Sequence, residues 1–224
     1  MKILSLSDTH GLHNRIPNDW FIEADVLVHS GDVSNMGYIQ EIKDFLSWFD
    51  KLNYKHKIFI AGNHDFGFQT NSEMIKQMLL DYPSIKYLQD EELIIDEYKF
   101  YGSPQTPYFH NWAFNCARDS QESKTYNKPL IKEYWDKIPL DTEILITHGP
   151  PYGIGDFVPY NNGQFVGCKD LLDKIYQLDK LKAHIFGHIH YSYGTIIKNN
   201  IQFINASTCN EQYQVIQKPI LIEI

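Results

Sequence analysis

Five short segments of the sequence carry histidine, aspartate and asparagine side chains directly after predicted strands. They are Asp8-Thr9-His10, Gly31-Asp32, Gly62-Asn63-His64-Asp65, Thr147-His148-Gly149-Pro150 and Gly187-His188-Ile189-His190. The carboxyl ends of strands border the ligand crevice in α/β sheets. We therefore expect the five segments to converge on one site, although they lie far apart along the chain.

Seven side chains in these segments have donor atoms that metal ions bind: two carboxylates, one amide and four imidazoles. They are Asp8, Asp32, Asn63, His10, His148, His188 and His190. A mixture of carboxylate and imidazole without thiolate suits manganese, iron or zinc, and it disfavours calcium or a cysteine-type structural zinc. One ion accepts about four to six ligands, so this donor set with one shared carboxylate indicates two divalent ions. Such a pair lies about 3.5–4 Å apart, activates a bridging water and neutralises a substrate oxyanion.

Each segment taken alone has a simpler interpretation. An aspartate at a strand end often caps a helix, and a His-x-His pair is more often an exposed strand edge than a metal site. This interpretation does not explain why five of the ten histidines follow strands beside glycine, aspartate or asparagine. The five segments together therefore favour a metal site.

The elements that would position these segments are short apolar runs, which predict strands, and amphipathic stretches, which predict helices. The predicted strands are Lys2–Ser7, Asp25–His29, Lys57–Ala61, Leu93–Asp96, Lys99–Gly102, Glu143–Thr147, Ala183–Gly187, Gly194–Lys198, Ile201–Asn205 and Ile220–Ile224. The predicted helices are Tyr38–Leu52, Ser72–Leu80, Lys128–Lys137 and Cys168–Leu178, with Ser72 as a candidate N-cap. Asn199-Asn200 between two β-branched runs predicts a hairpin turn. This pattern predicts one large mixed sheet or two packed sheets flanked by helices, within a single domain over residues 1–224.

The five segments also carry a resemblance to a known family. With the second segment extended to Gly31-Asp32-Val33-Ser34-Asn35, they resemble, in the same order, the five motif blocks of the calcineurin-like metallophosphoesterase superfamily. Residues 147–156 (THGPPYGIGD), 166–168 (VGC) and 204–209 (INASTC) are similar to its metallophosphoesterase-domain (MPPED, 239AB/239FB-like) branch. The resemblance implies the metallo-dependent phosphatase fold, a four-layer αββα sandwich of two mixed β-sheets flanked by helices.

The resemblance also implies a role for each donor. Asp8, His10 and His190 would hold the first ion, and Asn63, His148 and His188 the second, with Asp32 bridging the two. Manganese is the expected metal, with iron (Fe²⁺ or Fe³⁺) and zinc as alternatives. Asn63 would contact substrate as well as metal. His64 would bind substrate without ligating metal and act as acid or electrostatic stabiliser at the leaving oxygen, and Asn35 would orient His64.

The function implied is metal-dependent hydrolysis of a phosphoric ester. A hydroxide bridging the two ions would attack phosphorus, while Asp32 and His64 serve catalysis. Small phosphodiesters, cyclic nucleotides among them, are the expected substrates. A phosphomonoesterase acting on nucleotides or other small phosphates is one alternative. A non-catalytic nucleotide-binding relative and a protein in which the ions only stabilise the fold are two others.

The overall charge supports a small substrate. The chain of 224 residues has a formal net charge of −8 at neutral pH, which disfavours a general binder of nucleic-acid polymers. Its only arginines, Arg15 and Arg118, cannot form a cluster for phosphate, so divalent ions would have to supply the positive charge. We expect a small-molecule phosphoester as the partner, and the sequence leaves the oligomeric state open.

Cysteine usage and hydropathy indicate the compartment. The three cysteines are widely spaced and form no C-x-x-C pair, which is typical of a reducing environment with buried or idle thiols. The apolar stretch at the start is too short for a signal peptide, and the sequence contains no apolar run long enough to span a membrane. We therefore expect a cytoplasmic protein without membrane attachment.

An aromatic-rich segment at residues 101–114, interrupted by Pro104 and Pro107, has two interpretations. It is either an irregular loop packed by its own aromatic rings or a wall that stacks on a nucleobase or aryl group. Trp112 is the candidate substrate-binding residue of this segment. Replacing Trp112 would separate the two interpretations, because only a substrate wall would lose affinity at an unchanged melting temperature.

Overall fold

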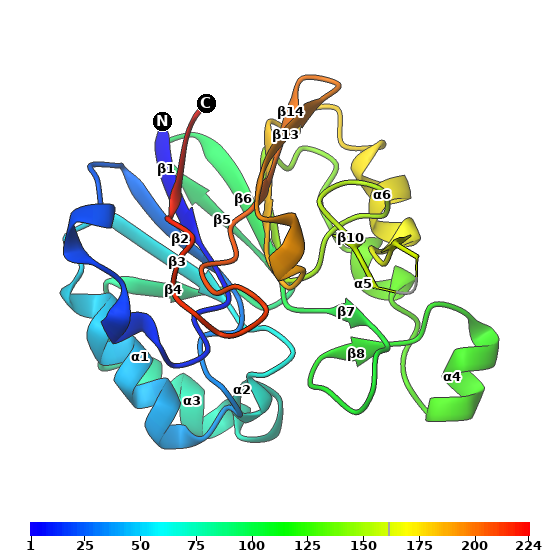
Figure 1. Cartoon of the computed structure of the whole chain (residues 1–224), viewed down its shortest axis with the longest axis horizontal. Helices are drawn as coiled ribbons and strands as arrows, with labels where there is room; N and C mark the ends of the chain where they lie inside the picture. Colours follow the sequence, from blue (N-terminus) through cyan, green and yellow to red (C-terminus); the bar gives the residue numbers. More distant parts are fainter. Residues whose placement is uncertain (161) are drawn as a thin grey trace.

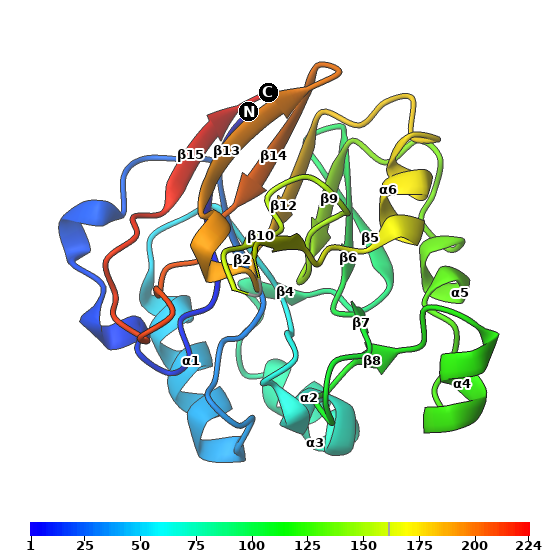
Figure 2. The ribbon, with the colours of Figure 1, turned by 45° about the vertical axis from the view of Figure 1, so that its right-hand side comes forward.

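The computed structural model describes residues 1–160 and 162–224. Two large mixed sheets lie face to face at its centre (Figures 1 and 2). The first sheet has the order β15-β1-β2-β3-β4, with bounds Ile220–Glu223, Lys2–Leu6, Val26–Ser30, His56–Ile60 and Ile85–Tyr87. The second has the order β13-β14-β12-β9-β6-β5, with bounds Gly194–Lys198, Ile201–Asn205, Ala183–Phe186, Ile144–Thr147, Tyr98–Ser103 and Glu91–Ile95. Two short pairs lie outside the sheets: β7 (Thr106–Pro107) with β8 (Asn115–Cys116), and β10 (Phe157–Val158) with β11 (Gln164–Phe165).

The central strands of each sheet run parallel. In the first sheet β1 to β4 are parallel, and in the second β6, β9, β12 and β14 are parallel. Antiparallel strands β15, β5 and β13 complete the edges. Because parallel strands end at the same edge of a sheet, the carboxyl ends of the central strands gather in one place.

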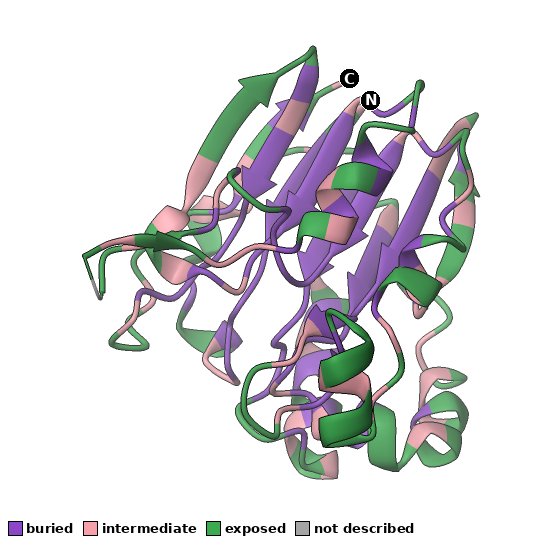
Figure 3. Cartoon of the chain, turned by 90° about the vertical axis from the view of Figure 1, so that its right-hand side faces the viewer, coloured by how far each residue is buried: buried purple, intermediate pink, exposed green. Residues whose placement is uncertain are grey.

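Alternation of side chains along the strands explains the layers. In β1, Ile3 packs in the core between the sheets, whereas its neighbour Leu4 packs against the helices of the first sheet. In β9, Ile146 faces the first sheet and Leu145 faces the helices of the second. Both faces of each sheet are therefore covered, which confirms the predicted four-layer αββα sandwich. Figure 3 shows the central strands buried along most of their length.

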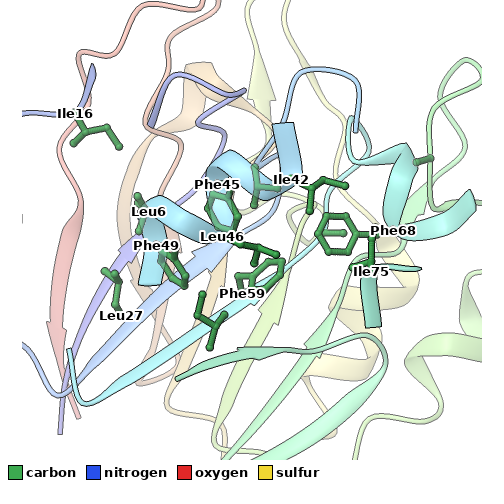
Figure 4. Close-up of a cluster of buried hydrophobic side chains, with 14 of the residues drawn as sticks. Leu6, Ile16, Leu27, Ile42, Phe45, Leu46, Phe49, Phe59, Phe68 and Ile75 are labelled. Carbon is green, nitrogen blue, oxygen red and sulfur yellow. The ribbon is translucent and has the colours of Figure 1, made fainter. Parts of the chain in front are cut away.

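The helices lie on the two outer faces. α1 (Ile39–Lys51), α2 (Phe66–Thr70) and α3 (Ser72–Leu79) cover the first sheet, and α5 (Lys132–Trp135) and α6 (Lys169–Ile175) cover the second. α4 (Ser120–Tyr126) has no buried residue. Helix α1 forms because Ile42, Phe45, Leu46 and Phe49 recur at helical spacing and all four are buried against β2 and β3 (Figure 4).

Every helix and strand predicted from the sequence is present, with ends displaced by a few residues. Asn199 and Asn200 both have left-handed backbones, as a tight hairpin turn requires. The assignment of Ser72 as an N-cap is wrong: Asn71 occupies that position, Ser72 is the first helical residue, and no side chain caps the helix. Helices α2 and α4 and the shortest strands are not predicted by the sequence pattern, because such segments are too short to show a period.

Two further predictions concern the chain as a whole. The three cysteines are free and buried, as expected. Among the described residues, the structure contains no helix with the length and apolar character to cross a bilayer. The assignment of residues 1–224 to a single domain stays a prediction.

Candidate metal centre

The candidate site lies where the carboxyl edges of the two sheets meet. Asp8 and Asp32 come two residues after the ends of β1 and β2, and Asn63 comes three residues after β3. His148 directly follows β9, and His188 comes two residues after β12. Main-chain hydrogen bonds join these strand ends: Asp8 N–H donates to Gly31 O at 2.9 Å, and Gly187 N–H donates to His148 O at 2.9 Å. The expected convergence of the five segments is therefore present in the structure.

Left-handed backbone directs several of these side chains into the site. Asp8, His10, Asp32 and His188 have φ values of 52°, 45°, 55° and 68°. A positive φ is uncommon in residues other than glycine, and strained backbone of this kind concentrates at functional sites. The clustering of four such residues at one sheet edge is an independent sign of function.

One cluster of donor atoms consists of Asp8, His10 and His190, whose potential ligand atoms all lie within 4.8 Å of one another. Asp8 Oδ1 is 3.2 Å from His190 Nε2 and 3.9 Å from His10 Nε2. The two imidazole Nε2 atoms are 3.4 Å apart. These are the three residues expected to hold the first ion.

The second cluster consists of Asp8, Asp32 and His148. Asp32 Oδ2 lies 3.3 Å from His148 Nε2, and Asn63 Oδ1 lies 2.9 Å from the same nitrogen. Asp32 Oδ2 is also 3.8 Å from His10 Nε2, in the first cluster. The buried Asp32 carboxylate is therefore within reach of both clusters, as a bridging ligand must be.

His188 is less closely integrated than the other expected ligands. Its ring centroid lies 5.0 Å from that of His148, and its backbone N–H donates to both carboxylate oxygens of Asp8, at 2.9 and 3.1 Å. Its side chain belongs to none of the compact donor groups among the described residues. The structure thus places His188 beside the second cluster, and its role as a ligand stays a prediction.

Backbone carbonyls orient two of the imidazoles. His148 Nδ1 lies 3.0 Å from Ser30 O, and His190 Nδ1 lies 3.0 Å from Asn210 O. A carbonyl can only accept, so each Nδ1 carries the hydrogen and each Nε2 faces the carboxylates. Metal-ligating histidines usually have this arrangement, in which the distant nitrogen donates to a carbonyl or carboxylate.

The two carboxylates of the site stay ionised. Burial alone would raise the pKa of Asp8, but the hydrogen bond from His190 and the nearby imidazoles hold it well below its usual value. Burial also opposes ionisation of Asp32, yet the charge of His148 lowers the pKa of this carboxyl. Two negative charges therefore face each other at a buried position and need positive charge close by.

The imidazoles of the site differ in their pKa values and therefore in their charge. Burial lowers the pKa of His10 to about 4 and that of His188 to about 3, so both are neutral, with a lone pair to donate. Burial also disfavours charged His148, but Asp32 outweighs it and raises the pKa to about 9. A divalent ion would supply the positive charge that a proton on His148 supplies here. The donor set therefore fits divalent cations.

Two glycines allow this close packing. A Cβ on Gly187 would overlap Asp8 Oδ2, and a Cβ on Gly62 would overlap Asp32 Oδ1. Any larger residue at either position would displace a carboxylate that belongs to the clusters. The absence of a side chain at these two glycines therefore leaves room for the carboxylates of Asp8 and Asp32.

His64 lies at the rim of the site. Its backbone N–H donates to Asp32 Oδ1 at 2.8 Å, and its Nδ1 lies 2.8 Å from the backbone oxygen of Asn35. The side chain of Asn35 is exposed, so the contact predicted for it is made by its main chain. Trp112 lies against His64, with ring centroids 4.1 Å apart. His64 also joins His10 and Asp32 in a third donor group, so proximity alone does not separate it from the ligands.

Comparisons with known proteins decide the family. The profile of the family described as Calcineurin-like phosphoesterase matches residues 1–192. The chain belongs to this family. Human Metallophosphoesterase domain-containing protein 1 is 35% identical over 243 aligned positions, which cover 100% of this chain and 71% of the human protein. A UPF0046 protein of Caenorhabditis elegans is 33% identical, and the alignment covers 100% of this chain and 81% of the C. elegans protein. These relatives confirm the resemblance to the MPPED branch.

Solved structures show the same fold. One crystal structure aligns with 99% of this chain and 98% of its own, with a TM-score of 0.64 and 16% identity. The structure of TT1561 of Thermus thermophilus aligns with 91% of this chain and 88% of its own, with a TM-score of 0.59 and 12% identity. At 16% and 12% identity, this similarity shows a shared fold and does not indicate a shared activity or substrate.

Three residues that support the site of this calcineurin-like phosphoesterase were not predicted from the sequence. Ser207 Oγ donates to Asp8 Oδ2 at 3.0 Å. Asp65 accepts from the backbone N–H groups of Val33, Ser34 and Gly62, and burial raises its pKa to about 6. Tyr213, in left-handed backbone, lies with its ring 4.7 Å from that of His10. Asp65 and Ser207 fall inside sequence motifs that resemble the family, whereas Tyr213 lies outside them.

The hydrogen bond from Ser207 gives a first testable prediction. Ser207→Ala should weaken binding of the metal ion next to Asp8 about 10-fold, because outer hydrogen bonds hold ligating carboxylates in place. Calorimetric titration of the metal-free protein with Mn²⁺ would measure the change. Ser47→Ala, which removes a hydroxyl that contacts Tyr82 on the helical side of the molecule, is the control. Equal affinities for wild type and Ser207→Ala would contradict the assigned role.

Proposed function

We propose that this calcineurin-like phosphoesterase is a dinuclear metal-dependent enzyme that hydrolyses small phosphodiesters. The observation that carries the proposal is the position of Asp32. Its Oδ2 lies 3.3 Å from His148 Nε2 and 3.8 Å from His10 Nε2, so one buried carboxylate can serve two ions. Asp8, His10 and His190 would hold one ion, and Asn63, His148 and His188 the other.

Bound divalent ions would activate water and neutralise charge on the phosphoryl oxygens. The chain itself supplies the remaining chemistry. Asn35 O accepts the Nδ1 hydrogen of His64, so a protonated His64 would present its Nε2–H to the leaving oxygen. Asn63 and His64 lie next to each other and would both contact the phosphoryl group.

The choice of a small diester rests on two observations. The net charge of −8 opposes binding of a long polyanion. The relatives match the MPPED branch, and resemblance to that branch implies small phosphodiesters such as cyclic nucleotides as substrates. Hydrolysis of nucleotide monoesters is the second candidate, because the donor set would neutralise a monoester equally well. Manganese as the metal and the cytoplasm as the compartment stay part of the proposal.

Metal removal tests the proposal. EDTA should abolish hydrolysis of bis(p-nitrophenyl) phosphate, and excess Mn²⁺ should restore it, since no arginine cluster can replace the ions. Metal analysis of the active protein should find about two ions per chain. Activity that survives complete chelation would contradict a metal mechanism. Tight binding of two ions without turnover of diesters or monoesters would favour a protein in which the metals only stabilise the fold.

A further inference from the structure

Trp112 makes a contact that the metal centre itself does not explain. Its indole lies on the imidazole of His64, with centroids 4.1 Å apart and an interplanar angle of 31°. The two rings are tilted, and at this centroid distance they are in direct contact. One face of the indole is thus occupied by a protein side chain, which a free wall for a nucleobase would not require.

Hydrogen bonds attach the loop of Trp112 to the segment that carries His64. The backbone N–H of Ala113 donates to Asn63 O at 3.0 Å, and that of Phe114 donates to Gln69 Oε1 at 3.3 Å. Asn63 directly precedes His64, and Gln69 lies in the helix that follows it. The indole and the imidazole are therefore held by the same short stretch of chain.

The other contacts of His64 still allow its imidazole ring to tilt, and the contact with Trp112 restricts this tilt. The bond between Nδ1 and Asn35 O, 2.8 Å long, fixes one ring nitrogen, and the His10 ring contacts the imidazole edge-on at a centroid distance of 4.6 Å. A ring held at Nδ1 can still tilt about that hydrogen bond. The flat indole face opposes this tilt, so it determines where the distant Nε2 points.

We propose that Trp112 is a positioning residue that holds His64 in the orientation needed to protonate the leaving oxygen. The inference rests on the proposed function, since it assigns Trp112 a purpose only if His64 serves phosphoester cleavage. It is an alternative to the interpretation of Trp112 as a wall for the substrate base. The two interpretations differ in what they predict for turnover, for KM and for the leaving group.

Trp112→Leu should lower kcat and leave KM unchanged. The loss should be about 10²-fold for a poor leaving group, the usual effect of a misplacement of about 1 Å. A p-nitrophenolate leaves without needing a proton, so its loss should stay below about 3-fold. In a series of diesters with nitro- to methoxy-substituted phenols, log kcat of Trp112→Leu should therefore fall more steeply with the pKa of the leaving phenol than log kcat of the wild type. Trp112→Phe, which retains an aromatic face, should restore most of the wild-type slope.

His64→Ala serves as the reference for this series. The double variant His64→Ala/Trp112→Leu should be no slower than His64→Ala alone, because Trp112 acts through the imidazole. Trp20→Leu, which removes an indole that contacts Lys218, is the matched control and should leave kcat and its slope unchanged. Losses that multiply in the double variant, or a rise in KM that is equal for all leaving groups, would overturn the proposal in favour of direct substrate contact.

A measurement without turnover keeps this inference separate from the proposed function. In the metal-free protein, NMR should show the His64 ring protons shifted upfield by the indole face, and this shift should disappear in Trp112→Leu. Unshifted His64 protons in the wild type would overturn the contact itself. Wild-type protein that shows the shift but hydrolyses no phosphoester with Mn²⁺ would instead refute the proposed function, and the catalytic purpose of Trp112 with it.

Discussion

Asp32→Asn is expected to lower kcat about 10⁴-fold, which corresponds to about 5.5 kcal/mol of lost transition-state stabilisation. The loss is this large because the carboxylate lies within reach of donors from both clusters. A neutral amide is a poor bridging ligand, and the charge of the ions would lose its main counter-charge. Asparagine has nearly the same shape and can still accept the backbone N–H of His64, so the loss would reflect ligation.

The measurement combines activity with metal content. Wild type and Asp32→Asn should be compared on bis(p-nitrophenyl) phosphate with excess Mn²⁺, and the ions bound per chain should fall from about two to one or fewer. Asp44→Asn is the control, because that carboxylate is 57% exposed and contacts His13 outside the clusters. Two bound ions and near-wild-type turnover in Asp32→Asn would refute a bridging role for this residue.

The convergence of the site was predictable from one regularity of the sequence. Asp8, Asp32, Asn63, His148 and His188 each follow an apolar run by one to three residues, and β1, β2, β3, β9 and β12 prove to be parallel within their sheets. Strand position and direction together place such residues at one edge. The apolar runs were recognisable because strands buried on both faces are continuously hydrophobic.

The details that orient the donors could not be read from residue types. The backbone carbonyls of Ser30, Asn35 and Asn210 accept from His148, His64 and His190, and any residue could offer a carbonyl there. The left-handed backbone of the donors depends on how the two sheets meet, which no local pattern encodes. Long-range packing, rather than local propensity, therefore sets the geometry of this site.

Packing also explains how the fold maintains this site although its buried charges and left-handed backbone are destabilising. Buried Asp8 and Asp32 repel each other, and the strained backbone at four donors costs further free energy, of order 1–3 kcal/mol each. The core between the sheets lies directly behind the strand ends that carry them. Rigid strands buried on both faces hold the donors in place, so a bound ion would relieve the repulsion without a large rearrangement.

His64→Ala is the second substitution with a large expected effect, a 10²–10⁴-fold loss of kcat on diesters with a poor leaving group, the usual contribution of a proton-transfer group. Unlike Asp32, this residue is expected to leave both ions bound when it is removed. The reason is its position: Nδ1 is used by Asn35 O, and the ring lies between His10 and Trp112 at the rim of the site. The third donor group, His10 with Asp32 and His64, makes the opposite outcome a real alternative.

Metal analysis beside kinetics decides between these two roles for His64. If His64 is an acid or electrostatic stabiliser, His64→Ala binds about two ions and its activity loss grows with the pKa of the leaving phenol. If His64 is a ligand, the variant loses an ion, the loss of activity is similar for all leaving groups, and excess Mn²⁺ restores part of it. His110→Ala, which removes an exposed imidazole near Phe109, controls for the loss of a histidine as such. Because both roles place His64 within reach of Asp32, only this pairing of metal content with leaving-group dependence separates them.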